Sequence, residues 1–211
     1  MRIVKLDAGT KKDILSNLLK RSPSQYDEYQ ADVNKILEDV RLRQDEAVFE
    51  YTAKFDGAKI NASNILVTEE EIEEAYNKVD NELIEIIRKS IENIRDFHAR
   101  QVQQSWFETK ENGIILGQRV TPIENVGVYV PGGKAAYPSS VLMNVIPAKV
   151  AGCKKIVMTT PPGPDGRIYE GTLVAANEAG VDEIYKVGGA QAIGALAFGT
   201  SIIPKVDQIV G

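Results

Sequence analysis

Apolar segments and helical segments alternate through the second half of the sequence, and this alternation restricts the fold more than any other feature. Each apolar segment is short and continuous, as in a parallel sheet that is covered on both faces. The four apolar segments are VGVYV (126–130), KKIVMTT (154–160), VDEIYKV (181–187) and VDQIV (206–210). The helical segments between them are 139–152, 168–180 and 189–199. Strands and helices in this order, joined by short links, predict a Rossmann-like parallel sheet with right-handed crossovers and flanking helices.

The first half of the sequence has the spacing of amphipathic helices instead. One helix is predicted over residues 10–20, and a longer helical segment runs from Tyr26 to a turn signal at Asp56-Gly57. Four apolar residues share one face of the first helix: Ile14, Leu15, Leu18 and Leu19. In the longer segment a similar face is formed by Val33, Ile36, Leu37 and Val40. Thr68 and Glu71 have the spacing of a capping box, which predicts the start of another helix.

The most regular helical stripe of the chain follows Asp80. Its members are spaced alternately three and four residues apart, so they lie on one helical face. They are Ile84, Ile87, Ile91, Ile94 and His98. From Gly113 the pattern changes, and residues 113–123 predict an edge hairpin or a connecting segment. We therefore expect an α/β protein with a mainly helical region over residues 1–112 and a Rossmann-like domain over residues 113–211.

The composition restricts the class of protein. The chain is 43% hydrophobic and 26% charged, as in globular proteins with a sizeable core, and its net charge of -5 does not favour binding to a nucleic-acid backbone. No apolar run reaches the roughly 18 residues of a membrane-spanning helix, and the N-terminus lacks the apolar region of a secretory signal. We therefore expect a cytoplasmic protein that binds neither nucleic acid nor a membrane.

The chain contains one histidine and one cysteine, and both fit a structural role. His98 continues an isoleucine stripe, which favours a packed side chain with one hydrogen bond over a general base or a metal ligand. Cys153 precedes two lysines, which would lower the pKa of a thiol. It stands at a helix-to-strand junction, however, where a small buried residue is common. We therefore expect neither residue to be catalytic.

Ligands of parallel sheets bind beyond the carboxyl ends of the strands. The segments predicted at that rim are Pro131-Gly132-Gly133, the loop from Thr159 to Gly166, and Gly188-Gly189-Ala190-Gln191. Their glycines would let the backbone approach a ligand closely. The Tyr129 ring could stack on a base or on nicotinamide, and Gln191 opens a helix. The pattern fits a ligand site, but it also fits ordinary turns at strand-helix junctions, and it does not name a ligand.

Several stretches resemble the histidinol dehydrogenase family. They are residues 126–162 (VGVYVPGGKAAYPSSVLMNVIPAKVAGCKKIVMTTPP), 187–200 (VGGAQAIGALAFGT) and 203–211 (IPKVDQIVG). The helical half agrees, since VRLRQDEAVFEYTAKFDG (40–57) and NIRDFHARQ (93–101) resemble that family's N-terminal segments. Gln44 is a departure, because the family commonly has glycine there. This departure concerns a turn and leaves the chemistry unaffected.

The resemblance implies a zinc-dependent, NAD-linked enzyme that oxidises L-histidinol to L-histidine through an aldehyde. It implies a fold similar to aldehyde dehydrogenases and an intertwined homodimer. The NAD-contacting tyrosine and glutamine of the family fall on Tyr129 and Gln191, and Pro131 and Phe55 are expected near the cofactor.

The resemblance also implies that much of the machinery lies elsewhere. Family members are considerably longer, and their zinc ligands and catalytic Glu-His pair match positions beyond Gly211. We therefore expect an N-terminal fragment with an incomplete Rossmann-like domain, no catalytic residue and no metal ligand. Two alternatives stay open: a fragment of a sister dehydrogenase that oxidises another small alcohol, and a non-catalytic α/β binding module.

Overall fold

The computed structural model describes residues 7, 9–12, 27–132 and 137–211. The predicted apolar face of the first helix, residues 14–19, lies outside the described residues. The helices are α2 (Asp27–Arg43), α3 (Asp45–Asp56), α4 (Glu69–Lys78), α5 (Asn81–Ala99), α6 (Pro138–Ala151), α7 (Glu170–Ala179) and α8 (Gly189–Phe198). The strands are β1 (Trp106–Thr109), β2 (Ile115–Gln118), β3 (Asn125–Tyr129), β4 (Lys155–Thr160), β5 (Glu183–Lys186) and β6 (Gln208–Val210).

The predicted parallel sheet is present. Its strand order is β5-β4-β3-β6, so β6 returns to the free side of β3 after two strands have been added on the other side. All three pairings are parallel, and they align Val126 with Ile156 in β4 and with Gln208 in β6. The chain therefore reverses direction across the sheet between β3 and β6. In open α/β sheets ligands bind beside such a switch point, at the carboxyl ends of the strands.

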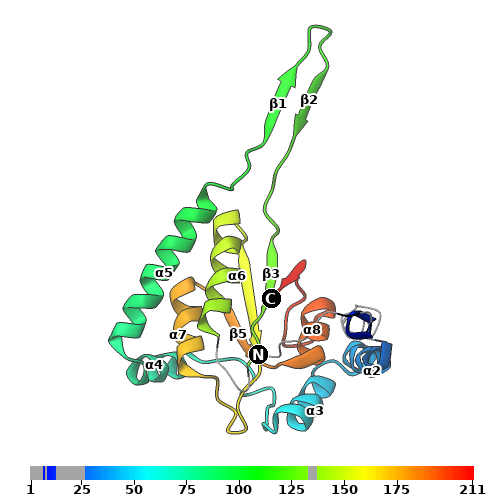
Figure 1. Ribbon diagram of the computed structural model, residues 1–211, viewed down its shortest axis with the longest axis vertical. Helices are drawn as coiled ribbons and strands as arrows, with labels where there is room; N and C mark the ends of the chain where they lie inside the picture. The colour runs from blue at the N-terminus through cyan, green and yellow to red at the C-terminus, as the bar shows by residue number, and fades with distance from the viewer. Residues whose placement is uncertain (1–6, 8, 13–26, 133–136) are drawn as a thin grey trace.

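Helices cover both faces of this sheet (Figure 1). Helices α4, α5, α6 and α7 pack together on one face, and α2, α3 and α8 pack together on the other. Strand β4 contributes side chains to the hydrophobic cores on both faces of the sheet. Ile156 and Met158 belong to the core under α4–α7, and Val157 belongs to the core under α2, α3 and α8. The continuous apolar run of β4 is thus explained by burial on two faces.

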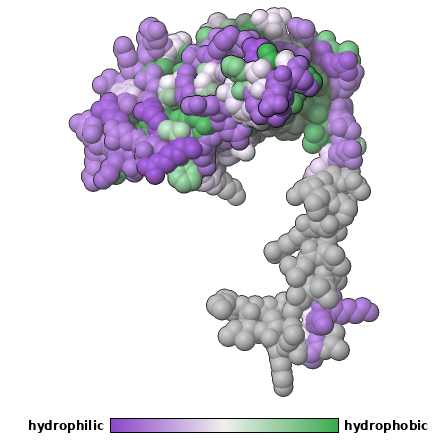
Figure 2. All heavy atoms as spheres, turned by 90° about the horizontal axis from the view of Figure 1, so that it is seen from above, coloured by the Kyte–Doolittle hydropathy of each residue, from purple (hydrophilic) through white to green (hydrophobic). Residues whose placement is uncertain are grey.

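The helical region confirms several sequence predictions. Ile84, Ile87 and Ile91 of α5 are buried and Ile94 packs against the same core, so the stripe is the inner face of the helix. Thr68 and Glu71 form the predicted capping box at the start of α4. Seen from above, hydrophilic residues cover most of the periphery and apolar residues gather in patches between them (Figure 2). Among the described residues, no helix is long and apolar enough to span a membrane.

The helical segment that was predicted from Tyr26 to Gly57 is interrupted. It ends at Asp56 as predicted, with Gly57 in the left-handed conformation, but Gln44 divides it into α2 and α3. Gln44 has φ 51° and ψ -127°, and it is the one non-glycine residue with positive φ in the described part of the chain. Such a conformation costs a residue with a Cβ about 1–3 kcal/mol. The glutamine therefore introduces strain at the turn where the resemblance implies a glycine.

Replacing Gln44 with glycine is expected to stabilise the protein by about 1 kcal/mol. The relief of strain exceeds the entropy that glycine loses on folding and the exposed hydrogen bond that Ser201 Oγ donates to the Gln44 side chain. Urea denaturation of Gln44→Gly and Gln44→Ala would separate these effects, because alanine loses the hydrogen bond and keeps the strain. A glycine variant no more stable than the alanine variant would show that the turn is unstrained.

The segment predicted as a hairpin or a connection belongs to a hairpin that starts earlier. Strand β1 pairs antiparallel with β2, from Trp106 opposite Gln118 to Thr109 opposite Ile115. This two-stranded sheet is separate from the main sheet, and it projects from the body as an arm (Figure 1). Its side chains are exposed, with Phe107 at 80%. The division proposed between residues 112 and 113 falls in its turn, and it stays a prediction.

Candidate cofactor-binding site

Tyr129 ends strand β3 at the carboxyl edge of the sheet. Its ring is partly buried and packs against the core under α8. Its hydroxyl oxygen accepts a hydrogen bond of 3.3 Å from the backbone N–H of Gly189, the first residue of α8. The tyrosine is therefore fixed across the gap between the end of β3 and the start of the helix that follows β5.

Gln191 lies in the first turn of α8, and only 1% of its surface is exposed. Neither Oε1 nor Nε2 of its amide has a hydrogen-bond partner among the described residues, and the same holds for Oγ1 of buried Thr159 at the end of β4. The amide folds towards Gly189, because a Cβ added there would lie 2.7 Å from Gln191 Oε1. A buried polar group without a partner costs about 1–3 kcal/mol. These groups therefore mark a place where a polar ligand would be stabilising.

The sequence predicted both Tyr129 and Gln191 at this rim, and the structure brings them together at Gly189. Tyr129 belongs to β3 and Gln191 to α8. The hydrogen bond between Tyr129 and Gly189 joins residues that are 60 positions apart in the sequence. Gly189 has φ 64°, a conformation that favours glycine, and a side chain there would meet the Gln191 amide. The glycine thus allows the amide to lie over the start of the helix.

A cavity of 870 Å³ lies at the same end of the sheet, beside the loop that follows β4. Phe55 and Pro131, the other two predicted residues, both line it, whereas Tyr129 and Gln191 do not. The remaining lining residues include Asp56, Gly132, Thr160, Arg167 and Tyr169. The four predicted residues therefore form two pairs on one rim instead of a single cluster.

Pro161 lies close to the loops beside both pairs, next to Gly132 and Gly188. A Cβ added at Gly132 would lie 2.7 Å from Pro161 Cγ, and one at Gly188 would lie 2.5 Å from Pro161 Cβ. These two glycines therefore let three loops close around a proline ring. This packing gives a structural reason for the two glycines, and their role in ligand access stays a prediction. Gly133, another glycine of the predicted rim, lies outside the described residues.

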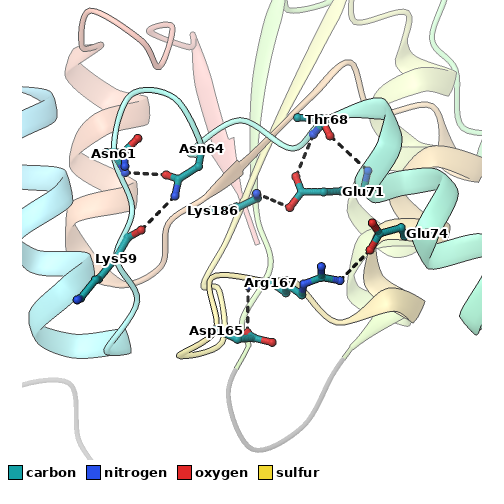
Figure 3. Close-up of polar contacts among 9 residues, drawn as sticks. All are labelled: Lys59, Asn61, Asn64, Thr68, Glu71, Glu74, Asp165, Arg167 and Lys186. Atoms are coloured by element: carbon teal, nitrogen blue, oxygen red, sulfur yellow. Dashed lines mark hydrogen bonds and ion pairs between the residues drawn. The ribbon is translucent and has the colours of Figure 1, made fainter.

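Polar groups on the helical side of the cavity form an ordered network (Figure 3). Lys186 ends β5 with only 4% exposure, and its Nζ lies 2.5 Å from Oε1 of Glu71, the capping-box residue of α4. Arg167 Nη1 donates to Glu74 Oε2 at 2.8 Å, one helical turn further along. The sequence analysis missed Lys186, because it identified the capping glutamate and not its partner. The network joins the helical region to the end of β5.

Burial changes the acidity of one carboxyl group and one thiol group. Asp56 ends α3 and lines the cavity, and burial raises the pKa of its carboxyl above the usual value. Its Oδ2 has no hydrogen-bond partner within the described ranges. Burial likewise raises the pKa of the Cys153 thiol, so this cysteine stays protonated at neutral pH and is not activated as a nucleophile.

His98 fits its predicted structural role. It is half-buried at the end of the α5 stripe, and its Nδ1 lies 2.7 Å from Gln101 Oε1. His98 and Cys153 line a second cavity of 590 Å³ near the base of the β1–β2 arm. In the part of the chain that the structure describes, no three His, Cys, Asp or Glu side chains are grouped to hold a metal ion. The described residues therefore do not fit a zinc site.

Comparisons with known proteins give a consistent family. The family model described as histidinol dehydrogenase matches residues 19–211. The chain is 56% identical over 194 residues to the histidinol dehydrogenase of Bacillus subtilis, covering 92% of this chain and 45% of the relative. It is 60% identical over 176 residues to the Geobacillus kaustophilus enzyme, covering 83% of this chain and 41% of the relative.

A solved structure agrees with these sequence matches. The crystal structure of histidinol dehydrogenase from Elizabethkingia anophelis superposes with a TM-score of 0.81 at 43% identity, over 86% of this chain and 42% of that chain. The chain thus spans less than half the length of the relatives it matches. The match extends over the helical region, the sheet and both pairs of rim residues. The chain therefore belongs to the histidinol dehydrogenase family.

Proposed function

We propose that this chain forms the NAD-binding part of an enzyme that oxidises L-histidinol to L-histidine through an aldehyde, at the end of histidine biosynthesis. The observation that carries the proposal is the arrangement at Gly189. There the Tyr129 hydroxyl accepts the backbone N–H, and the Gln191 amide is buried without a partner. Relatives named histidinol dehydrogenase support the activity.

The chemistry of the rim fits a nicotinamide. Its carboxamide carries one acceptor and two N–H donors, and the Gln191 amide offers the complementary set. The Tyr129 ring supplies an aromatic surface next to that amide. Bound NAD would accept the hydride that leaves histidinol. The residues of this chain would orient the nicotinamide and exclude water from it.

The other parts of the reaction are proposed to lie outside this chain. The described residues do not fit zinc, so we derive no step through the metal from them. The ligands of zinc, the base that removes the alcohol proton and most contacts to histidinol would come from sequence that the longer relatives possess. We further propose that the enzyme works as a homodimer in the cytoplasm and binds neither nucleic acid nor membranes. The net charge of -5 supports the exclusion of nucleic acid.

Removing either predicted side chain is expected to weaken NAD binding about tenfold or more. One lost hydrogen bond or aromatic contact of about 1.4 kcal/mol gives that factor. Isothermal titration of NAD into wild type, Tyr129→Ala and Gln191→Ala measures it.

Tyr29→Ala and Gln118→Ala are matched controls, because both residues are exposed and distant from the rim in sequence. They are expected to bind NAD like wild type. Equal affinity in Tyr129→Ala, Gln191→Ala and the two controls would show that the cofactor does not use this pair.

A further inference from the structure

The buried ion pair of Lys186 and Glu71 lies directly before the rim loop that follows β5. Lys186 is the last residue of β5 and is 4% exposed, and its Nζ donates to Glu71 Oε1 at 2.5 Å (Figure 3). Among the described residues, this carboxylate is the one acceptor that the Lys186 ammonium reaches. Because a buried ammonium needs a partner, Glu71 sets the position of the strand end that carries it.

The Glu71 carboxylate is itself fixed by the start of α4. Its Oε2 accepts the backbone N–H of Thr68 at 3.1 Å, and the Thr68 hydroxyl accepts the N–H of Glu71 at 3.3 Å. One oxygen of the carboxylate therefore caps α4 while the other holds Lys186. The carboxylate cannot follow a displaced lysine without losing the capping bond.

Backbone hydrogen bonds join the same two elements. Strand β5 is an outer strand of the sheet, and residues 65–67, which lead into α4, lie along its outer edge. Lys186 N donates to Ile65 O at 2.8 Å, and Val67 N donates to Ile184 O at 2.9 Å. The helical region thus holds the end of β5 from outside, through its backbone and through one side chain.

The path from Lys186 to the rim is short. Gly189, whose N–H donates to the Tyr129 hydroxyl, is three residues further along the chain. Val187 lies between them, has no exposed surface and donates its N–H back to a carbonyl of β5 at 3.0 Å. A displacement of the strand end would therefore move Gly189 and, with it, the first turn of α8 that carries Gln191.

On the basis of the NAD-binding function proposed above, we infer that Lys186 is a positioning residue of the rim. Held by Glu71, it sets the place of Gly189 and Gln191 relative to Tyr129, and through them the affinity for NAD. It acts through the strand end and without contact to the ligand. A buried ion pair is weak evidence for stability, because desolvation of both charges offsets their attraction, so a role in positioning can be separated from one in stability.

The test compares NAD binding to wild type, Lys186→Met and Lys155→Met by isothermal titration. Methionine keeps a long unbranched side chain without the charge. Lys155 is the matched control, because it pairs with Glu183 at 2.6 Å at the amino end of the same sheet, away from the rim. Lys186→Met is expected to bind NAD about tenfold more weakly, which corresponds to about 1.4 kcal/mol, and Lys155→Met like wild type.

Equal affinity in all three proteins would overturn the inference and leave the NAD-binding function standing. If wild type binds no NAD, the proposed function fails, and the inference that rests on it fails too. The double variant Lys186→Met/Glu71→Gln leaves no unpaired charge, and glutamine can still accept the capping N–H of Thr68. Its Tm is expected to be at least that of wild type, with NAD affinity still about tenfold low. Wild-type affinity in this variant would overturn the inference.

Amide hydrogen exchange without NAD gives a readout that does not depend on binding. In the double variant, the Gly189 N–H is expected to exchange faster by a similar factor, because its bond to the Tyr129 hydroxyl loosens. The amide of Val128, a buried residue of β3, is expected to keep the wild-type rate. An equal acceleration at both amides, or none at either, would assign the ion pair a purely structural role and overturn the inference.

Discussion

The purified 211-residue chain is expected to oxidise histidinol at no detectable rate. Removing a hydride from an alcohol carbon requires a base that takes the hydroxyl proton, and histidine is the usual one. The single histidine, His98, is held against Gln101 at the end of α5, and it lines a different cavity from Phe55 and Pro131. The single cysteine stays protonated because burial raises its pKa. Neither group can act on a substrate at the rim where we propose that NAD binds.

The expected loss is large. General base catalysis contributes about 10²–10⁴-fold, and polarisation by a metal ion contributes several kcal/mol more. Each 1.36 kcal/mol changes a rate tenfold, so the absence of both removes many orders of magnitude. The assay follows NADH absorbance with histidinol, NAD and zinc, with the Bacillus subtilis relative as a positive control. Turnover by this chain, in protein free of host enzyme, would mean that it holds a base that the structure does not reveal.

The largest effect on stability is expected from Gly188→Ala. The backbone of Gly188 has φ -118° and ψ -170°, which alanine also adopts, so the added methyl group acts only through space. That methyl would lie 2.5 Å from Pro161 Cβ, and a proline ring cannot rotate away. Overpacking of this kind costs about 1–3 kcal/mol, or roughly 6–12 °C in Tm at the upper end for a chain of this size.

Two further variants test the cause of that loss. In Gly127→Ala the new methyl would meet the ends of the Leu196 and Val206 side chains at 3.0 Å, and these can shift, so a smaller loss is expected. The double variant Gly188→Ala/Pro161→Gly is expected to be more stable than the sum of the two single changes predicts. If the changes in unfolding free energy of the two single variants simply add in the double variant, Pro161 and Gly188 are not in contact. Pro161 would then not be the residue around which the rim loops pack.

The strands and their parallel arrangement follow from the sequence, because a sheet covered on both faces needs continuous apolar runs such as 126–130 and 154–160. The position of β6 beside β3 does not follow from such runs. It depends on how α8 crosses the sheet, and therefore on packing between α8 and α2. The division of the long helix at Gln44 was also missed, since glutamine gives no turn signal and only its positive φ reveals the break.

The candidate site could likewise be predicted only in part from the sequence. Tyr129 and Gln191 could be placed at the carboxyl rim from the strand pattern, and the resemblance assigned them to NAD. Their convergence on Gly189, and the place of Phe55 and Pro131 in a cavity that the other two do not line, depend on loops from three strands meeting around one ring. The burial of Lys186 depends on a glutamate 115 residues away along the chain. Local patterns carry no information about such contacts.

Backbone amide NMR of the 23.2 kDa chain during an NAD titration tests the central claim most directly. The account predicts shifts at Gly188, Gly189 and Gln191, together with shifts at Phe55, Asp56 and Gly132 in the cavity that these three line. Shifts confined to the β1–β2 arm or to the cavity that His98 lines would contradict it, as would unchanged spectra at millimolar NAD.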